Sequence, residues 1–288
     1  SRKRGSLDMS DLLVIGADGM LGRCWTEMLD ARGIEHRATM LADLDITDPA
    51  ALDAFITPGT GWVVTCAAYT LVDAAEEHED LANEVNGHAV GRMAERCKDV
   101  GAKLLHYSTD YVFDGTASVP YPTNHPRSPV NAYGRGKAIA EEQIEQSGVE
   151  HLLVRSSWLY APWAQNFVLT IRKLAMSRTN LRVVDDQRGR PTDGRRLAEL
   201  SLELAELGAR GTFHVTDGGE CSWFELAALI AEVVNPSCRV DPCTSEEFPR
   251  PAPRPAYSVL DISATEQLVG PLIPWEARVR DVLGQVEP

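Results

Sequence analysis

Short strand-like runs, most of them apolar, alternate with longer segments of helical periodicity along the first half of the chain. These runs are residues 11–15, 34–39, 62–66, 103–107 and 152–154. Strands of a parallel sheet form continuous apolar runs because helices cover both faces of the sheet. The pattern therefore predicts an α/β fold built on a doubly wound parallel sheet.

The segments between these runs carry apolar residues at helical spacing and predict helices. They are residues 19–31, the segment that opens at Asp48, residues 83–100 and the segment that ends near residue 147. Asp48 is expected to be an N-cap, because a carboxylate accepts the free N–H groups of a first turn. Pro49 suits the first helical position, where the N–H group that proline lacks has no partner.

Beyond residue 155 the alternation becomes irregular. Helices are predicted near residues 164–177 and 193–207 and from Ser222 to residue 234, and strands near residues 181–184 and 212–215. Residues 249–255 contain four prolines, so this stretch must be extended.

The composition narrows the function without naming it. The chain has 288 residues, a formal net charge of −14 and a pI of about 4.9, so neither nucleic acid nor an anionic membrane is an expected partner. No apolar run reaches the roughly 18 residues of a membrane span. The six cysteines form no C-x-x-C pair and the histidines show no metal spacing, which favours a reducing cytoplasm and no metal site. A homodimer is compatible with the sequence.

Three glycines at the first junction between strand and helix predict a dinucleotide site. Gly16, Gly19 and Gly22 follow the apolar run 11–15 and precede the helix 19–31. Glycine allows a tight turn and lets the backbone approach a pyrophosphate, which the N-terminus of the helix attracts. A purely structural turn is the alternative. In this context the pattern predicts a Rossmann-type fold that binds a nicotinamide dinucleotide.

The second strand contains no acid at its end to bind a ribose 2′-hydroxyl group. Arg37 and Arg23 lie nearby, which favours the 2′-phosphate of NADPH over NADH, unless both arginines are solvated surface charges. Asp45 and Ile46 could contact adenine or belong to a helix cap. The small residues Ala67 and Ala68, followed by Tyr69, would let a cofactor lie against the third strand, or simply pack closely.

Tyr133 and Lys137 lie four residues apart and therefore on one face of a helix. An ammonium group beside a phenol favours the phenolate and lowers the pKa of the tyrosine, which prepares it to protonate a carbonyl oxygen. Thr109, or Ser108, ends the fourth strand and could hydrogen-bond the same oxygen. Asn86 is a candidate to relay water or hold Lys137, or is a structural amide. Together these groups predict hydride transfer to a carbonyl.

Several further stretches, in order along the chain, resemble the extended short-chain dehydrogenase/reductase superfamily, and within it the dTDP-4-dehydrorhamnose reductase family. They are residues 67–73, 106–113, 157–160, 166–167, 185–192 and 254–255. The resemblance implies reduction of the 4-keto group of a dTDP-4-dehydro-6-deoxy-sugar by NADPH, or NADH, with dTDP-4-dehydro-beta-L-rhamnose giving dTDP-beta-L-rhamnose as the expected case.

By the same resemblance Tyr133 is the acid, Lys137 its partner and Thr109 the hydroxyl at the carbonyl. The positions matched to cofactor contacts are Gly19, Met20, Leu21, Asp45, Ile46, Ala68, Tyr69 and Thr70. Asp110 and Trp158 match sugar contacts, Asn166 belongs to a motif of the family and is a candidate substrate contact, and Arg254 could pair with the diphosphate.

These assignments suggest three parts of the chain. Residues 1–10 are expected to be a tail, residues 11–155 an NAD(P)-binding domain, and residues 156–288 mainly a smaller substrate lobe that interleaves with the first domain.

Some residues depart from the family, and two other functions compete. Met20, Thr65 and Cys66 differ near the cofactor, while Arg190 and residues 161–164 differ near the expected sugar site. The second group leaves room for a different dTDP-4-keto-sugar. A non-catalytic NADP-binding subunit, like the methionine adenosyltransferase beta subunit, and a sugar-nucleotide epimerase or dehydratase are the competing hypotheses.

Overall fold

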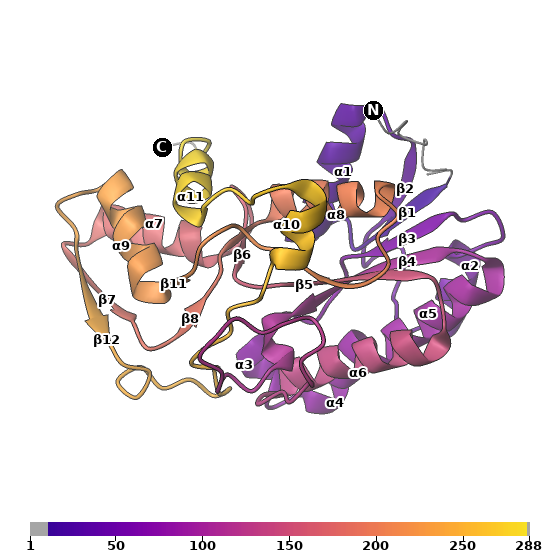
Figure 1. The fold of residues 1–288 in the computed structure, drawn as a ribbon, viewed down its shortest axis with the longest axis horizontal. Coiled ribbons are helices and arrows are strands. Elements are labelled where there is room, and N and C mark those ends of the chain that lie inside the picture. The colour runs from indigo at the N-terminus through magenta and orange to yellow at the C-terminus, as the bar shows by residue number, and fades with distance from the viewer. Residues whose placement is uncertain (1–10, 287–288) are drawn as a thin grey trace.

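A six-stranded parallel sheet forms the centre of the molecule, which the computed structural model describes over residues 11–286 (Figure 1). Its strands in spatial order are β10 (Gly211–His214), β5 (His151–Ser156), β4 (Lys103–Thr109), β3 (Trp62–Thr65), β1 (Leu12–Ile15) and β2 (His36–Thr39). Every pair of neighbouring strands is parallel. From β1 the chain adds β2 on one side and β3, β4, β5 and β10 on the other side. The predicted doubly wound sheet is confirmed.

Helices cover both faces of this sheet because successive strand residues point to opposite sides. On one face Leu12 and Val14 pack with α1 (Met20–Arg32) and α8 (Gly194–Glu206). On the other face Leu13 and Ile15 pack with helices that Figure 1 shows on the opposite side. These helices are α2 (Pro49–Phe55), α5 (Ala89–Val100) and α6 (Ala132–Ser147).

The remaining elements of the second half build a smaller lobe with its own apolar core. They are β6 (Leu159–Tyr160), α7 (Phe167–Ser177), β7 (Asn180–Val184), β8 (Arg188–Gly189), β9 (Thr192–Asp193), β11 (Cys221–Ser222), α9 (Trp223–Val234), β12 (Arg239–Cys243) and α11 (Trp275–Leu283). Helix α10 (Ser263–Val269) packs instead against α8 and β10 of the large sheet. Helices α7, α9 and α11 pack together with β7, and β12 pairs with β7. Because α8 and β10 return to the large sheet, the two halves of the chain interleave. The expected tail, residues 1–10, lies outside the described residues.

Local capping signals predicted helix starts well. Asp48 is the N-cap of α2, its side chain accepts the N–H of Ala50 at 2.9 Å, and Pro49 is the first helical residue. Ser222 begins α9 through a capping box with Glu225. Both predictions are confirmed, because these caps depend on a few neighbouring residues only.

The helix predicted over residues 83–100 begins earlier than predicted and is not regular α-helix throughout. It is preceded by α3 (Val72–Ala75), and it begins earlier as α4 (Glu79–Asn83). It then passes through a π-helical turn at Glu84–His88 before α5. Residues 110–112 form a short 3₁₀ helix directly after β4. The two-residue strands β6, β8, β9 and β11 were not predicted, because two residues show no periodicity.

A buried ion pair fixes α6 to the sheet. Glu141, which is fully buried, accepts two hydrogen bonds from Arg155 of β5, at 2.9 and 2.6 Å. Ser108 of β4 donates its hydroxyl to the same carboxylate, and Arg127 of the preceding loop approaches it at 3.2 Å. One carboxylate therefore joins the helix, two neighbouring strands and a loop.

Replacing Glu141→Gln is expected to lower the free energy of unfolding by about 3–5 kcal/mol, because the buried Arg155 loses its counter-charge. Glu145→Gln is the matched control, since Glu145 also binds Arg127 from α6 but is 45% exposed. Its loss is expected to cost less than about 1 kcal/mol. Urea unfolding followed by circular dichroism measures both values. Equal losses would contradict the structural role of the buried pair.

Candidate active site

The glycine loop borders a cavity of about 410 Å³ at the carboxyl ends of β1 and β3. Gly16 has φ of +82°, and a Cβ atom there would lie 2.7 Å from the backbone nitrogen of Ala67. A Cβ atom on Gly22 would lie 2.0 Å from the Gly16 carbonyl oxygen. The two glycines therefore let the loop, the helix and β3 meet closely, which leaves backbone and the start of α1 facing the cavity.

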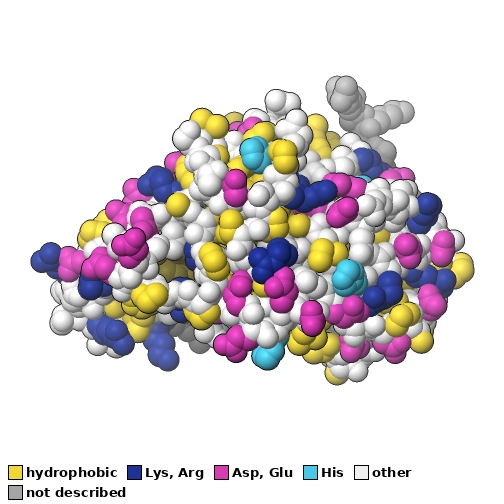
Figure 2. All heavy atoms as spheres, turned by 90° about the horizontal axis from the view of Figure 1, so that it is seen from below, with side chains coloured by type: hydrophobic (Ala, Val, Ile, Leu, Met, Phe, Trp, Pro, Cys, Tyr) yellow, Lys and Arg dark blue, Asp and Glu magenta, His cyan; other side chains and the backbone are white. Residues whose placement is uncertain are grey.

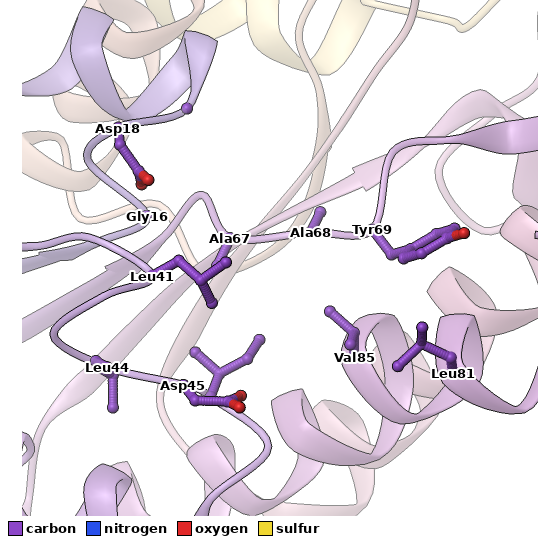
Figure 3. Close-up of a pocket in the computed structure, with 12 residues that line it drawn as sticks. Gly16, Asp18, Leu41, Leu44, Asp45, Ala67, Ala68, Tyr69, Leu81 and Val85 are labelled. Atoms are coloured by element: carbon purple, nitrogen blue, oxygen red, sulfur yellow. The ribbon is translucent and has the colours of Figure 1, made fainter.

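The cavity contains most of the predicted cofactor contacts. Figure 3 shows Gly16, Asp45, Ala67, Ala68 and Tyr69 around one opening. Its lining residues are Gly16, Asp18, Gly19, Leu41, Leu44, Asp45, Ile46, Ala67, Ala68, Tyr69, Leu81 and Val85.

Other predicted contacts lie beside the cavity, and some lining residues were missed. Met20, Leu21, Gly22 and Thr70 are not among the lining residues. Leu41, Leu44, Leu81 and Val85 were missed because they lie in loops and helices without a motif. The loop after β3 is held by Asn86, which accepts the N–H of Tyr69 at 2.8 Å and donates to its carbonyl at 2.9 Å. These bonds agree with the structural alternative for Asn86, an amide that holds the loop.

The two arginines expected near a 2′-phosphate point elsewhere. Arg37 forms a bidentate pair with Asp11 and also donates to Thr60 at 3.0 Å. Arg23 binds Glu27 at 2.7 Å, and its guanidinium lies over the ring of Trp163. Neither lines the cavity, so the argument that these arginines select NADPH is wrong.

The predicted catalytic residues converge between this cavity and a second one. Tyr133 lies in the first turn of α6, where Asn131 is the N-cap. Thr109 ends β4, and its hydroxyl hydrogen-bonds Tyr133 and lies 2.9 Å from Asp110 Oδ1. Lys137, one turn further along α6, is only 4% exposed and donates Nζ to the carbonyl of Tyr107 at 3.0 Å. Ser108 is directed to Glu141, so Thr109 is the hydroxyl beside Tyr133.

Burial controls the electrostatics of this group. Desolvation raises the pKa of Tyr133, the charge of Asp110 raises it further, and the hydrogen bond from Thr109 opposes both. Burial therefore outweighs any lowering of this pKa by Lys137, and the net shift is upward rather than downward. Desolvation lowers the pKa of Lys137 to about 8, against the opposing charges of Cys66 and Glu141. Tyr133 thus keeps its proton at neutral pH, as a proton donor requires.

A second cavity, of about 400 Å³, approaches Tyr133 through Tyr111. Tyr111, one of its lining residues, packs edge-on against Tyr133 with ring centroids 6.1 Å apart. Tyr69 of the first cavity and Tyr133 pack against the same cluster of buried alanines. The lining residues are Val72, Tyr111, Phe167, Ile171, Leu174, Arg182, Val183, Val184, Gln187, Trp223, Phe248, Arg250 and Arg254.

The predicted substrate contacts are distributed unevenly around this second cavity. Arg254 lines it, and Asp110 is buried beside Thr109, with its pKa raised to about 6 by desolvation. Trp158 is not a lining residue; it stacks on Trp223, with centroids 3.5 Å apart. Asn166 is the N-cap of α7, where it accepts the N–H of Leu169 and donates to Ala161. The roles of Trp158 and Asn166 in substrate binding stay predictions.

Comparison with known proteins places this geometry in a family. The family described as RmlD substrate binding domain matches residues 9–287. The chain belongs to this family. A dTDP-4-dehydrorhamnose reductase of Streptomyces griseus is 40% identical over 281 residues, which cover 93% of this chain and 91% of that one.

Two further members of this group are informative. The dTDP-4-keto-6-deoxy-D-glucose reductase of Streptomyces niveus is 38% identical, with 86% and 87% of the two chains covered. The crystal structure of the dTDP-4-dehydrorhamnose reductase of Bacillus anthracis, in complex with NADP, is 33% identical and has a TM-score of 0.91, with 96% and 99% of the two chains covered. The Rossmann-type fold is thus shared with a protein that holds NADP.

Alanine substitutions at Gly22 and Gly19 are expected to affect different properties of the protein. Gly22→Ala must push apart the loop and α1, so it is expected to lower the free energy of unfolding by about 2 kcal/mol or more. In Gly19→Ala the Cβ atom lies 3.4 Å from the nearest atom, so stability is expected to stay within about 0.5 kcal/mol. Because Gly19 faces the cavity, its added methyl group should still weaken nicotinamide dinucleotide binding. Thermal unfolding and cofactor fluorescence titration separate the two effects; a stable Gly22→Ala variant would contradict the packing argument.

Proposed function

We propose that this protein reduces the 4-keto group of a dTDP-4-dehydro-6-deoxy-sugar with NADPH, and that the substrate is dTDP-4-dehydro-beta-L-rhamnose, which gives dTDP-beta-L-rhamnose. The observation that carries the proposal is the position of Tyr133, between a cavity bordered by the glycine loop and a cavity that contains arginines. The names of the relatives and the NADP in the Bacillus anthracis structure support it. NADH is the alternative cofactor.

The residues of the first cavity fit a nicotinamide dinucleotide. The close backbone around Gly16 and Gly22 and the small side chains of Ala67 and Ala68 leave the room that a pyrophosphate and a flat ring require. When bound there, the cofactor supplies a hydride. Gly19, Asp45, Ile46 and Tyr69 would hold it, with Met20, Leu21 and Thr70 in the adjacent backbone.

The chain itself supplies the proton and the orientation. Tyr133 gives its phenolic proton to the carbonyl oxygen of the sugar while the carbon is reduced. Thr109 hydrogen-bonds the same oxygen and fixes its direction. The ammonium of Lys137, one helical turn away, stabilises the phenolate that Tyr133 becomes. Asp110, Trp158, Asn166 and Arg254 remain the proposed sugar-nucleotide contacts.

The competing functions have less support. A regulatory subunit has no need for a hydroxyl such as Thr109 to hydrogen-bond Tyr133, with Lys137 buried one helical turn further along α6. An epimerase or dehydratase keeps the same fold, and a dTDP-glucose 4,6-dehydratase of Streptomyces venezuelae is only 17% identical, so that likeness concerns the fold alone.

A reducing cytoplasm is the proposed setting of the reaction. All six cysteines are free thiols, which agrees with a reducing cytoplasm. Between residues 11 and 286 there is no helix whose length and apolar character would let it cross a membrane. A homodimer stays a prediction, which sedimentation or light scattering measures.

Tyr133→Phe is expected to lower kcat by at least about 1,000-fold, because the variant lacks the proton that the carbonyl oxygen receives. NADPH binding should stay within about twofold, since the ring still packs against Tyr111. The loss of absorbance at 340 nm with dTDP-4-keto-sugar, together with a fluorescence titration of NADPH, measures both. Tyr111→Phe is the matched control and should keep most of the activity. Turnover near the wild-type rate in Tyr133→Phe would exclude the phenol as the acid.

The rate of reduction is expected to fall as the pH rises through about 8. Below that pH Lys137 is protonated and stabilises the phenolate of Tyr133; above it the ammonium charge is lost. Lys137→Arg keeps a positive charge at every pH tested, so its smaller activity should show no such fall up to about pH 10. A pH–rate profile at saturating NADPH measures this. A flat wild-type profile would mean that the charge of Lys137 does not assist the proton transfer.

A further inference from the structure

Residues 161–165, which connect β6 to α7 in the small lobe, form a strap that reaches the start of α1. Trp163 donates its indole N–H to the carbonyl oxygen of Met20 at 3.4 Å, a long hydrogen bond. Met20 is the first residue of α1, directly after Gly19 of the glycine loop. The strap is absent from the described lining of the second cavity, although its departure from the family predicts a place near the sugar site. Two departures from the family, one at Met20 and one in the strap, therefore meet in space.

A second contact joins the strap to the same helix. On the face shown in Figure 2, lysine and arginine side chains lie beside aspartate and glutamate side chains, and Arg23 likewise has Glu27 as a partner at 2.7 Å. The guanidinium of Arg23 also lies over the ring of Trp163, 4.3 Å from the centroid. This cation–π contact adds to the attraction of the hydrogen bond. One indole therefore contacts the first turn of α1 through both its N–H group and its face.

The strap is held in place by the residue that begins α7. Asn166, the N-cap of that helix, donates its side-chain amide to the Ala161 carbonyl at 2.9 Å. The carbonyls of Trp163 and Ala164 share the same amide nitrogen at 3.3 Å each. Ala164 has φ of +59°, a left-handed conformation that costs energy for a residue other than glycine. Because such strain persists only where the surrounding contacts determine the backbone, the strap is a fixed element.

Apolar packing supports the junction from below the strap. Trp163 and Met20 pack against one apolar cluster that contains Cys24 of α1. A Cβ atom on Gly194, the first residue of α8, would lie 3.0 Å from Cys24 Sγ and 3.4 Å from the Tyr160 carbonyl oxygen. The starts of α1 and α8 and the end of β6 therefore meet closely, which gives the strap a firm base.

The first turn of α1 has no cap of its own. Its N-cap is Gly19, and no side chain of the described residues accepts a hydrogen bond there, whereas α2, α6, α7, α8 and α9 all begin with a side-chain cap. A side-chain cap would occupy the N–H groups that a pyrophosphate requires. The orientation of this turn must therefore come from contacts outside the helix, and Trp163 supplies two of them.

We propose that Trp163 is a positioning residue of the cofactor site, which holds the uncapped first turn of α1 in the orientation that a pyrophosphate requires. The small lobe thereby sets the affinity of a cavity that lies against the large sheet. The identity of the ligand rests on the proposed function, whereas the positioning of the helix does not.

Hydrogen–deuterium exchange of the full chain without cofactor, followed by NMR, tests the positioning directly. The reporter is the Arg23 amide, which bonds to the Gly19 carbonyl at 3.0 Å across this turn. Trp163→Ala is expected to speed its exchange about tenfold, because the indole contacts no longer oppose local opening. Trp163→Phe keeps a ring beside Arg23 but no N–H group, and is expected to speed the exchange about threefold.

The matched control removes the other partner of Arg23. Glu27 also contacts the Arg23 guanidinium, but from α1 itself and with 48% of its side chain exposed. Glu27→Gln is therefore expected to change the exchange of the Arg23 amide less than about twofold. The comparison separates the contact that comes from the small lobe from the one made within the helix.

NADPH affinity and kinetics are the second readout. Trp163→Ala is expected to raise the Kd of NADPH, measured by fluorescence titration, about tenfold, and Glu27→Gln is expected to leave it within about twofold. In Trp163→Ala the KM for NADPH should rise with the Kd, while kcat at saturating NADPH and the KM for the dTDP-sugar stay within about twofold. A role in overall stability alone would not produce this split.

The outcomes separate this inference from the proposed function. If the Arg23 amide exchanges at the wild-type rate in both Trp163 variants, or if Glu27→Gln speeds it equally, the strap does not position the turn and the inference fails. Unchanged NADPH affinity in Trp163→Ala, with faster exchange, would also overturn it. If Trp163→Ala does not fold, Trp163→Phe decides by the same two measurements. Wild-type protein that binds no NADPH would contradict the proposed function, while the exchange rates still decide whether Trp163 positions the helix.

Discussion

The position of α6 against the carboxyl ends of β4 and β5 is the constraint on which the candidate site depends. The buried carboxylate of Glu141 holds Arg155 of β5 and Ser108 of β4 at once, so the helix cannot slide along the sheet without exposing an unpaired charge. At its first turn α6 also approaches the neighbouring loop closely, since a Cβ atom on Gly134 would lie 2.2 Å from the Tyr111 carbonyl. Tyr133, which directly precedes Gly134, meets Thr109 because these two contacts fix the position of the helix.

The same packing explains the chemistry. Close burial removes water from Tyr133 and Lys137, and desolvation then raises the pKa of the phenol and lowers that of the ammonium to about 8. Because the phenol is hard to ionise, Tyr133 is protonated before the reaction. The ammonium one turn away stabilises the phenolate that forms when Tyr133 gives its proton to the substrate. Burial, rather than the charge of Lys137 alone, therefore sets the protonation state from which the reaction starts.

Charge is distributed so that each cavity suits a different partner. The cofactor cavity offers backbone, small side chains and two aspartates, whereas the cavity that approaches Tyr133 through Tyr111 offers arginines and aromatic rings. Arg37 and Arg23 illustrate why nearness in sequence is a poor guide to this distribution. A long side chain can turn either way at the end of a strand, and Arg37 turns to Asp11 because that carboxylate forms a bidentate pair with it.

The sequence by itself determined the parallel sheet, the glycine loop, the capped starts of α2 and α9, and the position of Tyr133 and Lys137 on one face of α6, because each depends on residues within a few positions of one another. Only the tertiary structure decided which groups meet across the chain. Asn86 turned out to hold Tyr69, Trp158 to support Trp223, and residues of β7 and of the proline-rich segment to share a cavity. Such contacts join residues as far apart in the sequence as Trp158 and Trp223, and their geometry is set by how the elements pack, which no local pattern records.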